Sequence, residues 1–149
     1  MNVTPYAVAQ RFIGLREIEG SAHHPLIQWG FLLCGYGTDT PDEVAWCSAI
    51  MQVPPYVLGL PRSGSAAARS WLQVGEPIEI GGATRGFDVV VLNRGNGPQD
   101  PSVIRAPGHV GWYVRHDERQ VWLLGGNQAD AFSIAPFPLE RVLGVRRLA

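Results

Sequence analysis

Three side chains that lie far apart along the chain could together perform nucleophilic catalysis: Cys47, His109 and Asn127. A cysteine nucleophile needs an imidazole within hydrogen-bond reach and a third polar group that holds the imidazole in the correct orientation. Cys47 stands at the start of a short apolar helix predicted over residues 45–52, and the positive end of a helix dipole favours the thiolate. Such a set would attack a carbonyl carbon, and backbone N–H groups at the helix start would stabilise the oxyanion.

The predicted elements explain how these residues could meet. His109 begins a predicted strand over residues 109–114, and Asn127 follows a predicted strand over residues 120–124. The polar residues 116–119 between the strands are typical of a tight turn, so the strands should pair as an antiparallel hairpin. This pairing places His109 beside residues 124–127, within reach of Asn127.

Each candidate also has a structural interpretation. Cys47 could be a small hydrophobic residue of the core, since most buried cysteines are. His109 could be an edge-strand residue without a role. Asn127 follows two glycines and could be a simple turn residue.

Other polar residues fit catalysis less well. Ser48 would point away from the helix in a different direction from Cys47. Asp88 could orient an imidazole, but its place before a β-branched run is typical of a strand start. His116 lies in the polar turn, where we expect it to be solvated. Cys34 lies in an apolar helical segment, which favours a packing role.

Composition narrows the class of protein. The chain has 149 residues, of which 46% are hydrophobic and 17% charged, and this is typical of a globular chain. We expect a single domain over residues 1–149. The formal net charge is −1 and no cluster of basic residues occurs, which argues against a nucleic-acid-binding protein, although single arginines could meet an anionic substrate.

Cysteine and histidine content argues against a disulfide framework and a metal site. The chain has 2 cysteines, Cys34 and Cys47, so at most one disulfide is possible. The adjacent His23 and His24 lack the spacing of two metal ligands on one helix face. We therefore expect neither a metal nor another cofactor.

The N-terminal region predicts no membrane insertion. The apolar stretch over residues 26–34 is too short to span a bilayer. The first residues lack the basic and apolar regions of a secretory signal. We expect synthesis in the cytoplasm, with action on the cell wall, in the periplasm or outside the cell, only after lysis or delivery by another route.

The order of elements predicts an α+β fold. Helices are expected over residues 5–13, from residue 21 to about 34, over 45–52 and over 65–72, with Val53-Pro54-Pro55 ending the third of them. Strands are expected over residues 87–92, 109–114, 120–124, 131–137 and 143–148. N-terminal helices should pack on one face of a C-terminal antiparallel sheet of about five strands.

Motifs along nearly the whole chain carry a family resemblance. They are Gly20-Ser21-Ala22-His23, Trp46-Cys47-Ser48-Ala49, Gly64-Ser65-Ala66, Ala68-Arg69-Ser70-Trp71-Leu72, Asp88-Val89-Val90-Val91-Leu92, Gly108-His109-Val110-Gly111-Trp112-Tyr113, Gly125-Gly126-Asn127-Gln128 and Arg141-Val142-Leu143-Gly144. Together they resemble the NlpC/P60 and CHAP group of papain-like cysteine peptidases and amidases, and in particular its small single-domain proteins from phages and bacteria.

The resemblance implies a papain-like fold with Cys47 as nucleophile and His109 as base. It assigns Asn127 as the residue that orients His109, with Gln128 as the alternative. Gly125 stands where CHAP-like proteins often have an acid, and the second histidine that is usual in NlpC/P60 proteins has no counterpart nearby. Trp46 stands where CHAP-like proteins often have a glutamine that would help to hold the oxyanion.

The implied activity is peptidoglycan hydrolysis at an amide bond of the stem peptide, as an endopeptidase or amidase. Trp46, Trp112 and Gln128 are the expected substrate-binding residues, and the loop over residues 94–108 is a further candidate wall of the groove. Expected partners are peptidoglycan and, by role, an immunity protein, a holin or a secretion or tail apparatus, and the chain itself is expected to be a monomer. The alternatives are an acyl or amide transferase on the same scaffold and a non-catalytic module of a virion or cell wall.

Overall fold

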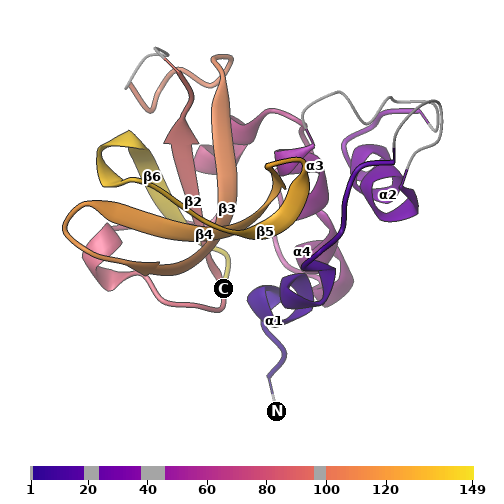
Figure 1. The fold of residues 1–149 in the computed structure, drawn as a ribbon, viewed down its shortest axis with the longest axis horizontal. Helices are drawn as coiled ribbons and strands as arrows, with labels where there is room; N and C mark the ends of the chain where they lie inside the picture. Colours follow the sequence, from indigo (N-terminus) through magenta and orange to yellow (C-terminus); the bar gives the residue numbers. More distant parts are fainter. Residues whose placement is uncertain (1, 19–23, 38–45, 96–99) are drawn as a thin grey trace.

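Helices precede strands in the computed structural model, which describes residues 2–18, 24–37, 46–95 and 100–149 (Figure 1). The helices are α1 (Pro5–Ala9), α2 (Pro25–Leu33), α3 (Cys47–Met51) and α4 (Val53–Leu58), and the 3-10 helices are η1 (Gln10–Phe12), η2 (Ala68–Gln73), η3 (Ile80–Gly82) and η4 (Leu139–Arg141). The strands are β1 (Glu76–Ile78), β2 (Asp88–Asn93), β3 (Gly108–His116), β4 (Gln120–Gln128), β5 (Ala131–Pro138) and β6 (Val142–Arg147).

The strands form one antiparallel sheet in the order β1-β6-β2-β3-β4-β5. The α+β class is therefore confirmed, but the expectation of about five strands is wrong, because the sheet has 6. The additional strand is β1, which pairs only with β6. Its Pro77 lies on an edge strand, where a missing N–H donor is tolerated, and a proline is unusual within a strand.

The start of α1 follows its sequence signals. The Oγ1 atom of Thr4 accepts a hydrogen bond from the N–H of Ala7 at 3.1 Å, and Pro5 takes the first helical position. Both features are favourable at a helix N-terminus. The helix is shorter than expected and continues as the 3-10 helix η1.

A second helix, which the sequence did not predict, follows the helix of Cys47. α3 ends at Met51, just before Val53-Pro54-Pro55 as expected, but a further helix, α4, begins at Val53 and runs to Leu58. Prolines in the first turn of a helix cost little because the N–H groups there have no partner within the helix. Gly59, with φ of 68°, then ends α4.

The short helix expected over residues 65–72 is instead the 3-10 helix η2. The Oγ atom of Ser65 accepts a hydrogen bond from the N–H of Ala67 at 3.1 Å, one turn earlier than η2 begins. Ser65 therefore stabilises the approach to η2 rather than its first turn.

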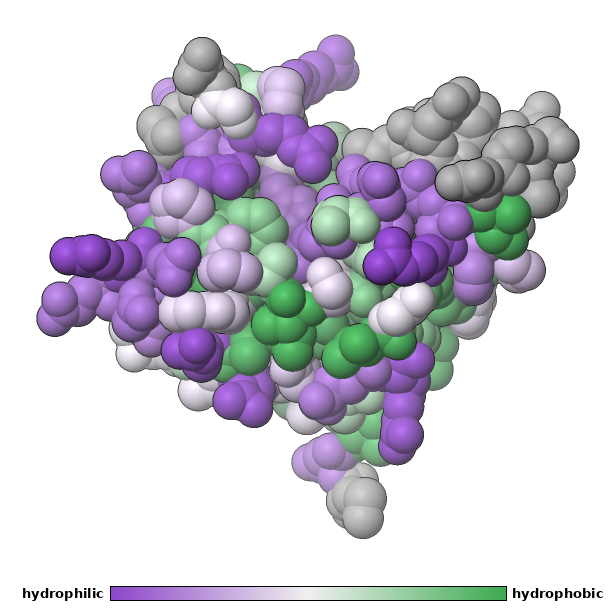
Figure 2. Space-filling model, viewed as in Figure 1, coloured by the Kyte–Doolittle hydropathy of each residue, from purple (hydrophilic) through white to green (hydrophobic). Residues whose placement is uncertain are grey.

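Two apolar clusters cover the two faces of the sheet. The larger cluster lies between the helices and one face, where Val110, Trp112 and Val114 of β3 meet Trp46, Cys47 and Ile50. The smaller lies on the other face and includes Val90, Leu92, Tyr113 and Leu123, with Phe137 against it. Figure 1 shows the helices gathered beside the curved sheet, and Figure 2 shows hydrophobic side chains in the middle of the same view with hydrophilic side chains around them.

Some expectations lie outside the described residues. They are the turn-rich approach over residues 39–42, the first residues of two expected helices at 21–23 and 45, and the Gly20-Ser21-Ala22-His23 motif. Among the helices that the structure describes, none has the length and apolar character needed to cross a membrane.

Candidate active site

Cys47 is the first residue of α3, and its side chain is buried. This helix packs against β3 and β4. The backbone N–H groups of Val110, Ser48 and Cys47 itself favour the ionised form of the thiol and so lower its pKa, as does the charge of Arg94. Burial has the larger effect and raises the pKa of Cys47 above its ordinary value. The balance favours a neutral thiol in the free protein, which differs from the thiolate expected from the helix position.

Trp46 anchors the helix that carries Cys47. Its indole N–H donates a hydrogen bond to the carboxylate of Glu17, and its ring packs against Gly126 of β4. A Cβ atom at residue 126 would lie 2.5 Å from Trp46 Cζ3, so only glycine leaves room for the indole. This contact fixes the start of α3 against the end of β4.

A polar network holds the other side of α3. Ser48 donates its hydroxyl hydrogen to the carbonyl of Ser65 at 2.6 Å and accepts from the indole N–H of Trp71 at 2.9 Å. Gln52, fully buried, donates to Ser63 Oγ at 2.9 Å and accepts from the N–H of Gly64 at 3.0 Å. Ser48 therefore has a structural role, and the network fixes residues 63–65 against the helix.

His109 is held by Gln128. The Nε2 atom of His109 lies 2.9 Å from Oε1 of Gln128. The Nε2 amide group of Gln128 donates to the carbonyls of Ser133 at 2.6 Å and Leu123 at 3.3 Å. Since carbonyl oxygens only accept, these contacts fix the amide with its oxygen towards His109. The neutral imidazole must then carry its hydrogen on Nε2 and a lone pair on Nδ1.

Nδ1 of His109 is buried and has no hydrogen-bond partner. The ring packs against Phe137, with 5.0 Å between ring centroids. Burial lowers the pKa of His109 to about 4, the hydrogen bond to Gln128 opposes this, and the charges of Arg94 and Arg141 lower it further. The imidazole is therefore neutral near neutral pH, and its unpartnered Nδ1 can act as a base.

The segment Gly125-Gly126-Asn127-Gln128 brings Gln128 to His109 through an irregularity in β4. The register with β5 shifts between Gly125 and Gln128, and Asn127 has φ of 58°, a conformation that asparagine tolerates better than most residues. A Cβ atom at residue 125 would lie 2.9 Å from Gln128 Oε1, so Gly125 makes room for the amide.

Gln128, rather than Asn127, contacts His109. Within the described residues no hydrogen bond joins Asn127 to the imidazole, although both residues line the same pocket. The contact with His109 that the sequence analysis expected of Asn127 is therefore made by Gln128, the alternative. The physical reason is the register shift, which turns Asn127 into the αL conformation and returns the next side chain to the ring.

Cys47 and His109 both lie near the start of β3, but Cys47 packs in the larger cluster with Val110, whereas the ring of His109 packs against Phe137, beside the smaller cluster on the other face. The thiol lies at the N–H of Val110, the residue that follows His109, and Gly108 lines the same hollow as Cys47. No hydrogen bond joins the thiol to the imidazole in the described structure. Direct proton transfer between the thiol and the imidazole therefore requires the two side chains to approach each other when substrate binds.

Two pockets flank this pair and share Arg94. The first, here called the Cys47 pocket, has a volume of about 240 Å³ and is lined by Cys47, Arg94, Ala66, Ala67, Ala68, Ala106, Pro107 and Gly108. The second, the His109 pocket, has a volume of about 520 Å³ and is lined by His109, Arg94, Arg141, Asn127, Gln128, Ala129, Ser133, Ile134, Ala135 and Phe137.

Arg94 and Arg69 were not identified as site residues from the sequence. Arg94 follows β2, and its charge acts on both Cys47 and His109. Arg94 could have been identified from the sequence by its position at the start of the Gly- and Pro-rich loop. Arg69 is fully buried and donates to the carbonyls of Pro107 at 3.1 Å and Val103 at 3.1 Å, which fixes the segment before His109.

Trp46 and Trp112 are core residues in this structure. Both side chains are fully buried in the larger apolar cluster. A buried indole offers no surface to a substrate, so the expectation that they form walls of a groove is corrected. Gln128 and Arg94, the first residue of the 94–108 loop, do line the His109 pocket.

The remaining candidates have structural roles. Asp88 forms an ion pair with Arg147 at 2.7 Å, far along the sheet from His109. Nδ1 of His116 lies 2.6 Å from the hydroxyl of Tyr113. Cys34 and Cys47 are both free thiols, so they form no disulfide. Among the described residues, no cluster of His, Cys, Asp and Glu could hold a metal ion.

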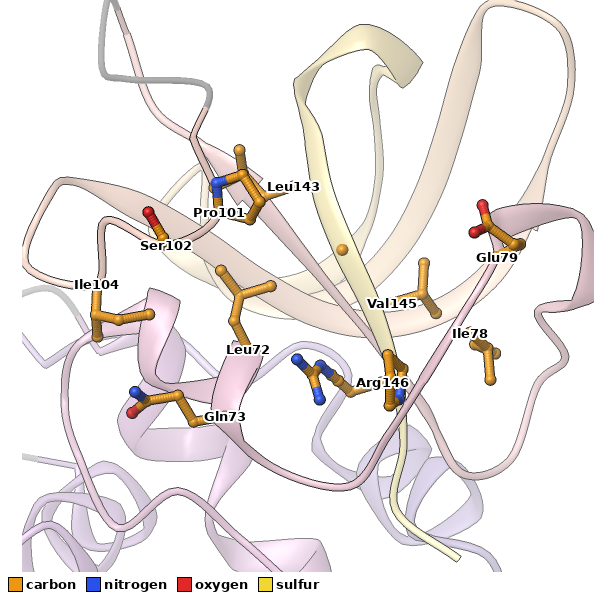
Figure 3. Close-up of a pocket in the computed structure, with 12 residues that line it drawn as sticks. Leu72, Gln73, Ile78, Glu79, Pro101, Ser102, Ile104, Leu143, Val145 and Arg146 are labelled. Carbon is orange, nitrogen blue, oxygen red and sulfur yellow. The ribbon is translucent and has the colours of Figure 1, made fainter.

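A separate hollow of about 550 Å³ lies away from these residues. Figure 3 shows that it opens between η2, the segment around Pro101 and strand β6, with Leu72, Ile104, Leu143 and Val145 among its lining side chains. It holds neither a cysteine nor a histidine. Size alone therefore does not identify the candidate active site, which is defined by Cys47, His109 and Gln128.

Comparison with known proteins gave no match, either to a protein-family model or to a curated protein.

Proposed function

We propose that this chain is a peptidoglycan hydrolase that cleaves an amide bond of the stem peptide, as an endopeptidase or amidase, through a cysteine mechanism. The observation that carries the proposal is the fixed tautomer of His109, whose Nδ1 lone pair is buried and unpartnered beside the β3 end that the thiol contacts. The choice of peptidoglycan as substrate rests on the resemblance to NlpC/P60 and CHAP proteins, and so does a papain-like architecture, which the packing of α3 on β3 and β4 supports.

The first chemical step forms a thioester. Nδ1 of His109 removes the thiol proton as Sγ of Cys47 attacks the carbonyl carbon of the amide. Burial favours the neutral forms of both groups, so this proton moves with the attack rather than before it. His109 then gives the proton to the leaving nitrogen, the C–N bond breaks, and the amine departs.

The second step regenerates the thiol. His109 removes a proton from water as the water oxygen attacks the thioester carbonyl, and the C–S bond breaks. The acid product leaves, and Cys47 takes the proton back from His109. Gln128 holds Nε2 throughout and stabilises the imidazolium that forms in each step.

Backbone groups at the start of α3 are the proposed oxyanion donors. The N–H groups of Cys47 and Ser48 favour negative charge on the sulfur and would lie beside a carbonyl oxygen attacked by it. The side chain of Trp46 is engaged with Glu17 and cannot take the place of the glutamine found in CHAP-like proteins.

Mass spectrometry of purified muropeptides tests the proposal. Wild type should produce fragments with new amine and carboxylate termini, which also identify the bond, and Cys47→Ala should produce none. Addition of an amine acceptor separates hydrolysis from acyl transfer, because a transferase would form the new amide. Identical muropeptide profiles with wild type, with Cys47→Ala and without protein would refute the enzyme proposal.

A further inference from the structure

Among the residues that the structure describes, the His109 pocket is lined by positive charge and by no carboxylate. Arg94 and Arg141 both line it, and none of the lining residues that the structure describes is an aspartate or glutamate. Within the described residues no salt bridge joins either arginine to a carboxylate. Both charges reach His109, since both lower the pKa of its imidazole. An arginine side chain that faces a pocket without a carboxylate partner is available to an anionic ligand.

Arg141 is held in place for such a contact. Its Nε and Nη2 atoms donate to the carbonyl of Asn93 at 3.2 and 2.8 Å, and its guanidinium lies 5.6 Å from the ring centre of Phe137. These contacts use one edge of the guanidinium. The remaining donors can bind a ligand without first losing conformational freedom, which is the condition for tight recognition of a carboxylate.

Arg94 differs from Arg141 because its side chain is exposed and lines both pockets. It therefore stands at the border between the Cys47 pocket and the His109 pocket. A ligand that spans the two pockets must pass Arg94, whichever end enters first.

The chemistry of the proposed reaction assigns a substrate component to each pocket. The acyl component becomes bonded to Sγ, so it must lie beside Cys47. The amine component receives a proton from His109, so it must lie beside the imidazole. The Cys47 pocket is narrow and lined by alanines, whereas the His109 pocket is larger and positively charged.

We infer that the His109 pocket binds a carboxylate on the amine component of the substrate, with Arg94 and Arg141 as the binding residues. This inference rests on the proposed function, and it adds the substrate class: an amide whose leaving amine carries a free carboxylate. The carboxylate also offsets the two positive charges beside His109, which raises the pKa of the imidazole in the complex and makes it a better proton acceptor.

Amidated substrates test the inference. Muropeptides are compared with the same muropeptides after their carboxylates have been coupled to ammonia, which removes the charge and keeps nearly the same shape. For wild type we expect kcat/KM to fall by about 10-fold to 100-fold on amidation, the size expected for loss of charge-assisted hydrogen bonds. For Arg94→Gln we expect a lower kcat/KM than that of wild type with the native substrate. Amidation of the substrate should then reduce this kcat/KM by a smaller factor than it does for wild type. Arg11→Gln, which removes an exposed positive charge from η1, should behave like wild type.

Equal digestion of both substrates by wild type, or the same loss on amidation in wild type and Arg94→Gln, would overturn the inference while the hydrolase proposal stands. Binding is measured independently of turnover by NMR of the His109 ring in Cys47→Ala. Native muropeptides should shift its resonances and raise its pKa, and amidated muropeptides should not. No shift with native muropeptides, or equal shifts with both, would overturn the inference even if wild type digests neither substrate.

Discussion

The side-chain oxygen of Gln128 lies 2.9 Å from Nε2 of His109. The amide nitrogen of the same glutamine is used by two backbone carbonyls, so the oxygen can only accept from the imidazole. One hydrogen bond thereby determines which ring nitrogen carries the proton and leaves Nδ1 as the base. The proposed mechanism depends on this contact.

Loss of the Gln128 amide should reduce catalysis more than stability. Without the acceptor the imidazole can rotate or change tautomer, so we expect Gln128→Ala to lower kcat/KM by roughly 100-fold. Hydrolysis of purified muropeptides, measured with protein shown by circular dichroism to be folded, provides the test.

Asn127→Gly is the matched control for Gln128→Ala. Residue 127 has a positive φ, which glycine adopts without strain, so this variant should keep nearly full activity. A large loss of activity in Asn127→Gly with wild-type activity in Gln128→Ala would instead make Asn127 the orienting residue.

Gly126 should be indispensable for the packing of Trp46. A methyl group at residue 126 would lie 2.5 Å from the indole and 2.8 Å from Ile50, and neither buried group has room to move. We expect Gly126→Ala to lower the free energy of unfolding by at least about 2 kcal/mol, measured by urea denaturation. Gly82→Ala, at an exposed site with no atom near the added methyl group, should change it by less than about 1 kcal/mol. Equal stability of the two variants would contradict the close contact between β4 and Trp46.

Arg69 should hold the segment that precedes His109. Its guanidinium is fully buried and donates to carbonyls of residues 103 and 107, which would lose their partners in Arg69→Met. We expect this variant to lose at least about 2 kcal/mol of stability and to be cleaved faster by protease within residues 100–108. Arg11→Met, at an exposed site, serves as the control and should show neither effect. Wild-type protease resistance in Arg69→Met would show that the segment is held by other contacts.

Stability should fall in mild acid because His109 is buried in its neutral form. Its pKa is about 4 in the folded protein, against 6.5 for an unperturbed histidine, so the unfolded chain binds the proton first as pH falls. The neutral imidazole of His109 contributes fully to the free energy of unfolding above about pH 6.5. This contribution falls as the pH is lowered and is lost near pH 4, a decrease on the order of 3 kcal/mol.

The variant His109→Asn separates the contribution of His109 to the pH dependence of stability from the contributions of the other titrating groups. The difference in unfolding free energy between wild type and His109→Asn, measured by urea denaturation at several pH values, should change over this interval and be constant above it. A difference that does not vary between about pH 4 and pH 6.5 would mean that His109 is not buried in its neutral form.

The sequence predicted the elements whose patterns are local. The strand from Asp88 and the hairpin that brings His109 beside the end of β4 follow β-branched runs and a polar turn, and both are present. The cap by Thr4 is likewise a local signal. β1 was missed because it is held only by pairing with β6, which is a long-range interaction that Glu76-Pro77-Ile78 does not encode by itself.

Only those features of the candidate site that depend on local sequence patterns could be predicted. Cys47 and His109 were identified from the positions that they take on their own elements. The choice between Asn127 and Gln128 depends on a register shift in β4, and such a shift follows from the packing of Gly125 and Gly126 against other elements. The role of Arg94 depends on the two pockets that it borders, and these exist only in the folded chain.

The central claim is that Cys47 attacks the substrate and carries its acyl group. Mass spectrometry of the protein, quenched with acid during turnover of muropeptides and then digested, measures this directly in wild type and in Cys47→Ala. The account predicts an added acyl mass on the peptide that contains Cys47 in wild type, no such mass on the peptide that contains Cys34, and neither adduct nor product with Cys47→Ala. Continued release of product by Cys47→Ala would contradict it.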